Sequence, residues 1–164
     1  MKNKVKSLSP IVDHRTKVLI LGSMPGRESL QRQEYYANSR NKMWEILFAI
    51  FDERVEDSYQ KKIEFLKDKE IRLWDVLKEC EREGSLDKNI KDEVPNDFKS
   101  FLREHPNIEL ILFNGKKAFE DFKKMIGIDV LGDIEYKRMA STSPTYAIKI
   151  ELKIQEWGII KEFI

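Results

Sequence analysis

Two runs of apolar residues with few polar interruptions constrain the fold of this chain more than any other feature. They are "KVLILG" at 17–22 and "IELILFN" at 108–114. A strand with one face in water alternates apolar and polar residues, whereas a strand covered on both faces is apolar throughout. Two shorter candidates complete the pattern. The sequence therefore predicts a central, mostly parallel sheet of four strands, which cover 17–22, 71–74, 108–113 and 135–140.

Helical patterns separate these strands. Apolar residues recur at helical spacing in six segments, several of which begin at a capping residue or end at glycine or proline. The predicted helices cover 42–51, 58–69, 76–84, 95–106, 115–127 and 143–157. Asp75 and Ser143 are the predicted N-caps of the third and the last of them. Strands that alternate with helices predict an α/β fold, a three-layer α/β/α sandwich that forms a single domain over residues 1–164.

The composition narrows the function. A formal net charge of +1 provides no global field toward nucleic acid or membrane, so any anion-binding site has to be local. The sequence has one cysteine, Cys80, which excludes an internal disulfide. One cysteine and two histidines are too few to supply the usual ligands of a zinc site. We expect no metal and no cofactor. The sequence contains no signal-peptide core and no apolar run long enough to span a bilayer, so we expect a cytoplasmic protein that contacts no membrane. We also expect a monomer.

The residues that follow each strand carry the candidate chemistry. In parallel sheets, ligands bind outside the carboxyl ends of the strands. Four groups should therefore meet at one edge of the sheet, although they are distant in sequence. They are the turn 22–26, Asp75, the pair Asn114 and Gly115, and the segment 140–146. Of these, Asp75 is interpreted as a helix cap despite its place at the edge.

Five segments in this order carry a family resemblance. They read "LILGSMPGRESL", "YYANSRNKMWEIL", "LWDVL", "LFNGKKAF" and "STSPTYA". Together they resemble the uracil-DNA glycosylase superfamily, and within it the hypoxanthine-DNA glycosylase branch, from about residue 10 to the last helix. The resemblance implies an enzyme that flips a deaminated base, hypoxanthine by preference, out of DNA and hydrolyses its N-glycosidic bond. Three alternatives stay open: a uracil- or mismatch-specific glycosylase, an inactive DNA-binding member, and an enzyme for free nucleosides.

Met24 stands where most branches of the superfamily carry Asp, Asn or Glu. A thioether can neither position a water molecule nor stabilise charge on a sugar. The hypoxanthine branch is similar in lacking the usual group, and the resemblance implies that an asparagine of the next segment replaces it. We favour Asn41, with Asn38 as the alternative. The residue by itself predicts only that Asn41 caps the helix that follows.

The resemblance also assigns the remaining contacts. Asn114 is implied to read the base, because its amide matches the lactam of hypoxanthine, a carbonyl next to an N–H. Tyr36 is the predicted stacking partner, with Tyr35 as the other candidate, and the turn is implied to contact the base through Ser23, Met24 and Gly26. The residues predicted to contact the DNA backbone are Ser141, Thr142, Ser143, Pro144, Tyr146 and Lys116.

Overall fold

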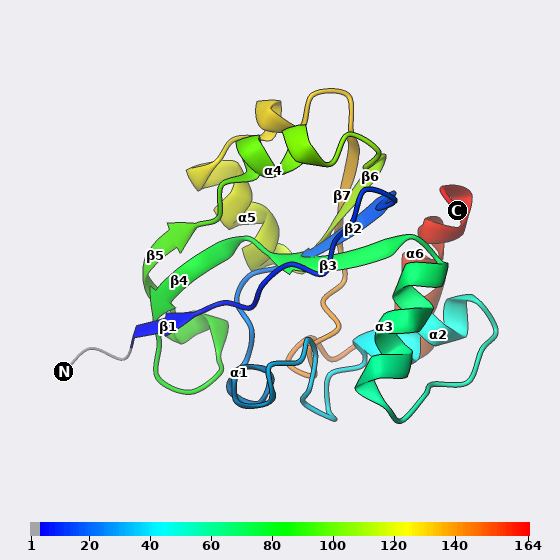
Figure 1. Cartoon of the computed structure of the whole chain (residues 1–164). Helices are drawn as coiled ribbons and strands as arrows, with labels where there is room; N and C mark the ends of the chain where they lie inside the picture. The colour runs from blue at the N-terminus through cyan, green and yellow to red at the C-terminus, as the bar shows by residue number, and fades with distance from the viewer. Residues whose placement is uncertain (1–3) are drawn as a thin grey trace.

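The computed structural model describes residues 4–164, and at Asp87 only the backbone (Figure 1). Its main sheet has four parallel strands in the order β3-β2-β6-β7. The strands are β2 (Val18–Gly22), β3 (Ile71–Asp75), β6 (Leu110–Asn114) and β7 (Glu135–Met139). Val18 lies opposite both Ile71 and Leu110, so the strands end at a common edge. The four predicted strands are therefore confirmed to within two residues at each end.

Helices cover both faces of this sheet. Val18 and Ile20 pack into a core with α2 (Met43–Ile50), α3 (Tyr59–Asp68) and α6 (Ile150–Trp157). Leu19 and Leu21 point the other way, into a core with α4 (Phe98–Glu104) and α5 (Lys116–Met125). Successive side chains of a strand point to opposite faces, so a strand between two helical layers has to be apolar at every position. The predicted three-layer α/β/α sandwich is confirmed.

Four short helical elements complete the helical structure of the described residues. They are α1 (Arg27–Arg32) and the 3-10 turns η1 (Asp87–Asn89), η2 (Ile128–Leu131) and η3 (Gly158–Glu162). In residues 4–164, no helix is long and apolar enough to cross a bilayer.

A second, antiparallel sheet replaces the helix that we predicted after Asp75. It consists of β1 (Lys4–Lys6), β4 (Leu77–Glu81) and β5 (Lys91–Pro95), in the order β1-β4-β5. Leu77 and Cys80 are its buried positions, and their spacing of three is compatible with a helix. The spacing was misleading because β4 has an irregular register against β5, and its other partner, β1, lies far away in the sequence.

Two other predicted helices begin later than expected. Pro95 ends β5, and α4 starts at Phe98 behind Asp97, whose carboxylate accepts from the Ser100 N–H at 3.1 Å. The last helix starts at Ile150 with Lys149 as its N-cap, so Ser143 is not a helix cap. Residues 141–149 form turns and irregular backbone instead, which leaves them available at the edge of the sheet.

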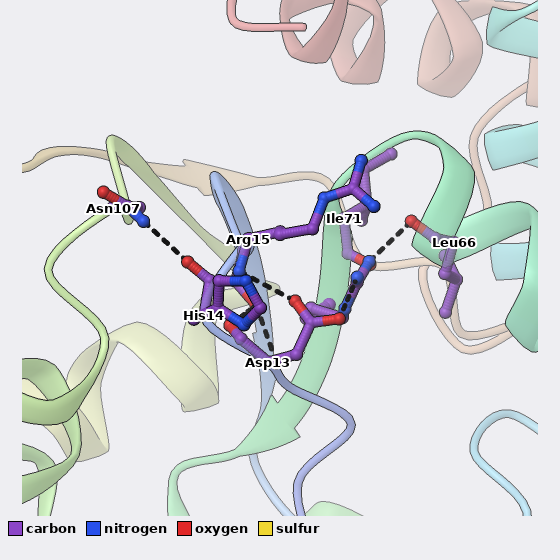
Figure 2. A network of polar contacts seen from close by, with 8 residues as sticks. Asp13, His14, Arg15, Leu66, Ile71 and Asn107 are labelled. Carbon is purple, nitrogen blue, oxygen red and sulfur yellow. Dashed lines mark hydrogen bonds and ion pairs between the residues drawn. The ribbon is translucent and has the colours of Figure 1, made fainter.

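A polar network fastens the amino-terminal edge of the sheet (Figure 2). Arg72, on β3, is 1% exposed, and its guanidinium donates to the carbonyl oxygens of Leu66 at 2.7 Å and Ile71 at 2.8 Å. The same guanidinium forms an ion pair of 2.8 Å with Asp13. Burial opposes ionisation of Asp13, but the hydrogen bonds from Arg72 and Arg15 outweigh it and lower the pKa of its carboxyl. This network lies at the opposite end of β3 from Asp75 and is structural.

Candidate active site

A cavity of about 360 Å³ opens at the carboxyl ends of β2, β3 and β6. Figure 1 shows α1, the segment before α2 and the loop after β7 gathered at this edge of the sheet. The Lys42 N–H donates to the Thr142 carbonyl at 3.1 Å and so joins the segment before α2 to the loop after β7. The lining consists of residues 22–29, 35, 36, 38, 40, 41, 75, 85, 86, 114, 141 and 143–145.

The turn after β2 is held firmly by the rest of the protein. The Gly22 and Ser23 carbonyls accept from the N–H groups of Val76 at 2.8 Å and Leu77 at 3.1 Å. The Pro25 carbonyl accepts from the Arg82 guanidinium at 2.6 Å. A turn that is fixed in this way can present its backbone to a ligand without reorganising, which is what stabilisation of developing charge requires.

Met24 packs into the core beneath this turn. It is 7% exposed and belongs to the same apolar cluster as Leu21 and Trp74, while also forming part of the cavity wall. The thioether thus fills space at the position where the resemblance implies that a polar catalytic group has been lost.

Asp75 is a functional candidate that the sequence interpretation missed. No helix follows it, so it does not cap one; its side chain is buried and lines the cavity. Asp75 lies opposite Gly22 in the β2–β3 register, and a Cβ on Gly22 would stand 2.6 Å from Asp75 Oδ1 and 3.3 Å from Tyr36 Oη. Only glycine therefore leaves room for these two groups. The signal in the sequence was the position of Asp75 at the carboxyl end of a buried strand.

Asn114 organises the floor of the cavity through three hydrogen bonds. Its Oδ1 accepts from the Thr142 N–H at 2.9 Å, which fixes the orientation of the amide. Its Nδ2 donates to Thr142 Oγ1 at 2.9 Å and to Tyr36 Oη at 3.3 Å. In this conformation both amide N–H groups have protein partners, and the remaining acceptor capacity of Oδ1 is what the side chain can offer a base.

The two adjacent tyrosines differ in their surroundings. Tyr35 is buried, and its hydroxyl donates to the Ser9 carbonyl at 2.9 Å. Tyr36, with a positive φ of 54°, brings its hydroxyl to Asn114. Burial first, and the negative charge of Asp75 second, raise the pKa of the Tyr36 hydroxyl well above its usual range. Tyr36 is therefore neutral, and its O–H is a donor next to a carboxylate.

Asn38 and Asn41 both line the cavity, and the two make the same kind of local contact. Asn41 Oδ1 accepts from the Met43 N–H at 3.0 Å at the start of α2. Asn38 Oδ1 accepts from the Arg40 N–H at 2.8 Å. The N-cap of α2 is Lys42, so Asn41 lies one position before the predicted cap, although its side chain accepts the hydrogen bond from the first helical N–H. Asn41 also borders the cavity, so that its amide can take a second role.

The loop after β7 contributes Ser141, Ser143 and Pro144 to the cavity, and its Thr142 is buried behind Asn114. Two further predicted DNA contacts, Tyr146 and Lys116, are exposed and lie outside the lining.

Lys153, on α6, supports this loop from below. Its Nζ donates to the Ser143 carbonyl at 3.4 Å and lies 5.5 Å from the centre of the Tyr146 ring, and burial lowers the pKa of its ammonium group. In residues 4–164, no group of three or more His, Cys, Asp or Glu side chains is placed to hold a metal ion.

Comparisons with known proteins agree with this architecture. Residues 9–161 match the Uracil DNA glycosylase superfamily. Two similar curated proteins are each named hypoxanthine DNA glycosylase. The relative from Methanosarcina barkeri is 42% identical over 118 residues, which are 71% of this chain and 75% of the relative. The relative from Methanosarcina acetivorans is 44% identical over 111 residues, which are 67% of this chain and 70% of the relative.

A solved structure extends the likeness over the whole length. It is a solution NMR structure of a Methanosarcina acetivorans protein provisionally identified as a uracil DNA glycosylase. It superimposes with a TM-score of 0.83 at 34% identity and covers 98% of both chains. The chain therefore belongs to the uracil DNA glycosylase superfamily.

Proposed function

We propose that this protein releases hypoxanthine from DNA and leaves an abasic site, using the cavity at the carboxyl edge of the main sheet. Membership of the superfamily, together with the two curated relatives, makes the chain a DNA glycosylase, a hydrolase of N-glycosyl bonds. The finer points, which are the base and the residues that act on it, rest on the chemistry of the cavity.

The observation that carries the exclusion of adenine is the polar floor of Asp75, Tyr36 and Asn114. Uracil presents the same N–H beside a carbonyl, so the preference for hypoxanthine is supported by the two curated relatives. Hypoxanthine presents an N–H beside a carbonyl oxygen. A carboxylate accepts from that N–H, and a neutral tyrosine hydroxyl donates to that oxygen. Adenine presents a bare ring nitrogen and an amino group at the same two places, so it would set an acceptor against the Asp75 carboxylate. An unmatched buried polar group costs about 1–3 kcal/mol, which is enough to discriminate strongly.

Bond cleavage places positive charge on the sugar and negative charge on the departing base. We assign Asn41, with Asn38 as the alternative, to hold the attacking water through its amide oxygen. A cationic sugar needs only a weak nucleophile, so a neutral amide suffices. The negative charge of Asp75 favours the cationic sugar, and the rigid turn offers backbone N–H groups at Met24 and Gly26 to the departing base. We assign Ser141 and Ser143, which line the cavity, to contact the DNA backbone through their hydroxyls.

A panel of labelled duplexes tests the proposal. Each duplex carries one deoxyinosine, deoxyuridine, deoxyxanthosine or normal deoxyadenosine, and abasic sites are read as strand breaks after alkali. We expect release from deoxyinosine and none from deoxyadenosine. If uracil is the best substrate, the result supports the uracil- or mismatch-specific alternative. Binding of DNA without release of any base would support an inactive DNA-binding protein. Turnover of free inosine with no reaction on DNA would support an enzyme for nucleosides.

Asp75→Asn gives the sharper test of base choice. An amide can rotate to donate to a bare nitrogen, so we expect a slower reaction on deoxyinosine and a smaller ratio of deoxyinosine to deoxyadenosine rates. Asp133→Asn serves as a matched control, because it makes the same substitution at an exposed aspartate outside the cavity lining and should leave both rates unchanged. An unchanged ratio in Asp75→Asn would contradict the role of the carboxylate.

The protein is further proposed to act as a monomer in the cytoplasm. Light scattering coupled to size-exclusion chromatography should give the mass of one chain of 19.5 kDa. A dimer mass at the concentrations of the activity assay would contradict this.

A further inference from the structure

The buried stripe of α6 contains one charged residue. Ile150, Ile154 and Trp157 pack against the core that α6 shares with α2 and α3. Lys153 has the same helical spacing, since residues three and four positions apart lie on one face of a helix, and it is only 4% exposed. An apolar side chain at this position would satisfy the packing of the helix, so the presence of a lysine calls for another reason.

The ammonium group of Lys153 has no counter-charge from the part of the chain that the structure describes. It forms no ion pair there, and burial lowers its pKa without an opposing contribution from a nearby carboxylate. Glu156, three positions along α6, accepts from the Ala140 N–H at 2.9 Å instead. The contacts of Lys153 Nζ are the Ser143 carbonyl at 3.4 Å and the Tyr146 ring, whose centre is 5.5 Å away. Because a buried charge without a counter-charge is unfavourable, an anion that bound here would be stabilised by it.

The turn over Lys153 is polar and belongs to the cavity. Ser143, Pro144 and Thr145 line the cavity, and the last two are exposed. The Ser143 carbonyl that contacts the ammonium group also accepts from the Tyr146 N–H at 3.1 Å, which closes the turn. The hydroxyls of Ser143 and Thr145 share a hydrogen bond of 2.9 Å. The turn thus combines hydroxyl donors with a cation that supports it, a combination that suits an oxyanion.

We propose that Lys153 is a positioning residue for DNA, whose buried charge attracts a phosphate of the target strand to the turn 143–146. The hydroxyls of the turn make the direct contact with that phosphate. This inference rests on the proposed function, because it requires DNA at the cavity. The formal net charge of +1 means that any attraction to phosphate is local. A charge held inside the protein is screened less by water and salt than an exposed one, so a single lysine suffices.

Three variants separate the charge of Lys153 from its packing. Lys153→Met removes the charge but keeps a long, flexible, apolar side chain. Its melting temperature should equal or exceed that of the parent, because an uncompensated buried charge is lost. Lys153→Arg keeps the positive charge and serves as the rescue variant. Lys161→Met is the matched control, since it makes the same change of net charge at an exposed lysine on η3, outside the cavity lining.

The experiment measures the affinity for a labelled duplex by fluorescence anisotropy over a series of salt concentrations. One duplex contains deoxyinosine, and the other contains deoxyadenosine at the same place. For Lys153→Met we expect binding about tenfold weaker, the scale of one interaction with a charged group, and a log–log salt slope shallower by about one. The loss should be the same on both duplexes, because a phosphate carries no base identity. Lys153→Arg and Lys161→Met should keep the affinity and the slope of the parent.

The outcomes distinguish this inference from the proposed function, because binding does not require base release. The parent slope in Lys153→Met, or a loss confined to the deoxyinosine duplex, would overturn the role of the charge. A clearly lower melting temperature in Lys153→Met would also overturn it, because the lysine would then serve the fold. The same holds for a folded Lys153→Arg variant with the slope of Lys153→Met. A parent protein that shows the expected salt dependence but releases no hypoxanthine would refute the proposed function alone.

Discussion

Replacing Asn41 separates a helix cap from a catalytic amide. The Asn41 oxygen accepts from the Met43 N–H at 3.0 Å, so removing the side chain costs one capping hydrogen bond. Such a cap is worth about 1 kcal/mol, which lowers the melting temperature by about 2–4 °C in a domain of this size. With an ordinary stability of about 5–15 kcal/mol, the protein remains almost fully folded after that loss. Any large loss of rate in Asn41→Ala would therefore be chemical in origin.

Serine at position 41 makes the separation cleaner. Serine caps helices about as well as asparagine, but its shorter side chain has no amide to hold a water molecule over the sugar. For Asn41→Ser we expect a melting temperature close to that of the parent and a single-turnover rate on deoxyinosine lower by about 100-fold or more, as for the loss of one preorganised catalytic hydrogen bond. The affinity for DNA should change little, because the lost contact acts mainly in the transition state.

Asn38→Ser is the matched control, since Asn38 lines the same cavity and its oxygen makes a similar local hydrogen bond, to Arg40 at 2.8 Å. It should retain most of the rate. The opposite result, with Asn38→Ser inactive and Asn41→Ser active, would move the catalytic amide to the loop. Full activity in both variants would refute the idea that an asparagine of this segment has taken over the lost function of the turn.

Four further predictions concern the turn, the polar network, the DNA contacts and the chemistry. Met24→Ala should lower the free energy of unfolding by about 2–3 kcal/mol, as expected for a buried methionine at the edge of a core. Its rate of base release should stay within about tenfold of the parent. A variant that is folded but inactive would mean that the thioether takes part in the chemistry. Asp13→Ala should cost about 1–3 kcal/mol because it removes the carboxylate bonded to buried Arg72. Since folding lowers the pKa of Asp13, this difference from the parent should be present near neutral pH, shrink below the usual aspartate pKa of 3.8 and disappear as the pH falls through the lowered pKa of the folded protein. A difference that persists in acid denaturation curves below that range would exclude the ion pair as its source. A log–log plot of duplex affinity against salt concentration should have a shallow slope of about −2 to −4, as expected for few phosphate contacts, and a steep slope would contradict this. EDTA should not slow base release, and borohydride should not trap a covalent adduct with DNA; a trapped adduct would contradict hydrolysis without a covalent intermediate.

Much of the main sheet follows from the sequence because burial on both faces leaves a local record. The runs 17–22 and 108–114 are apolar at nearly every position, and no other common element requires that over so few residues. Parallel strands also bring their carboxyl ends to one edge, so the sequence alone predicts that the turn after β2, Asn114 and the loop after β7 meet there. The resemblance of five short segments added the family, which the comparisons bear out.

The tertiary structure decided the features that depend on partners distant in the sequence. β4 is a strand because β1 and β5 pair with it, although the spacing of Leu77 and Cys80 also suits a helix. Once β4 replaces the helix, Asp75 is no cap: its carboxylate lies in the cavity beside Tyr36, where only a glycine at position 22 leaves it space. The position of Leu86 at the rim likewise depends on hydrogen bonds that span 57 and 58 residues. The local pattern of apolar residues indicates which faces of an element are buried. Which segment lies beside that element depends on the whole chain. The residues that form the floor and the rim of the cavity could therefore be identified only from the tertiary structure.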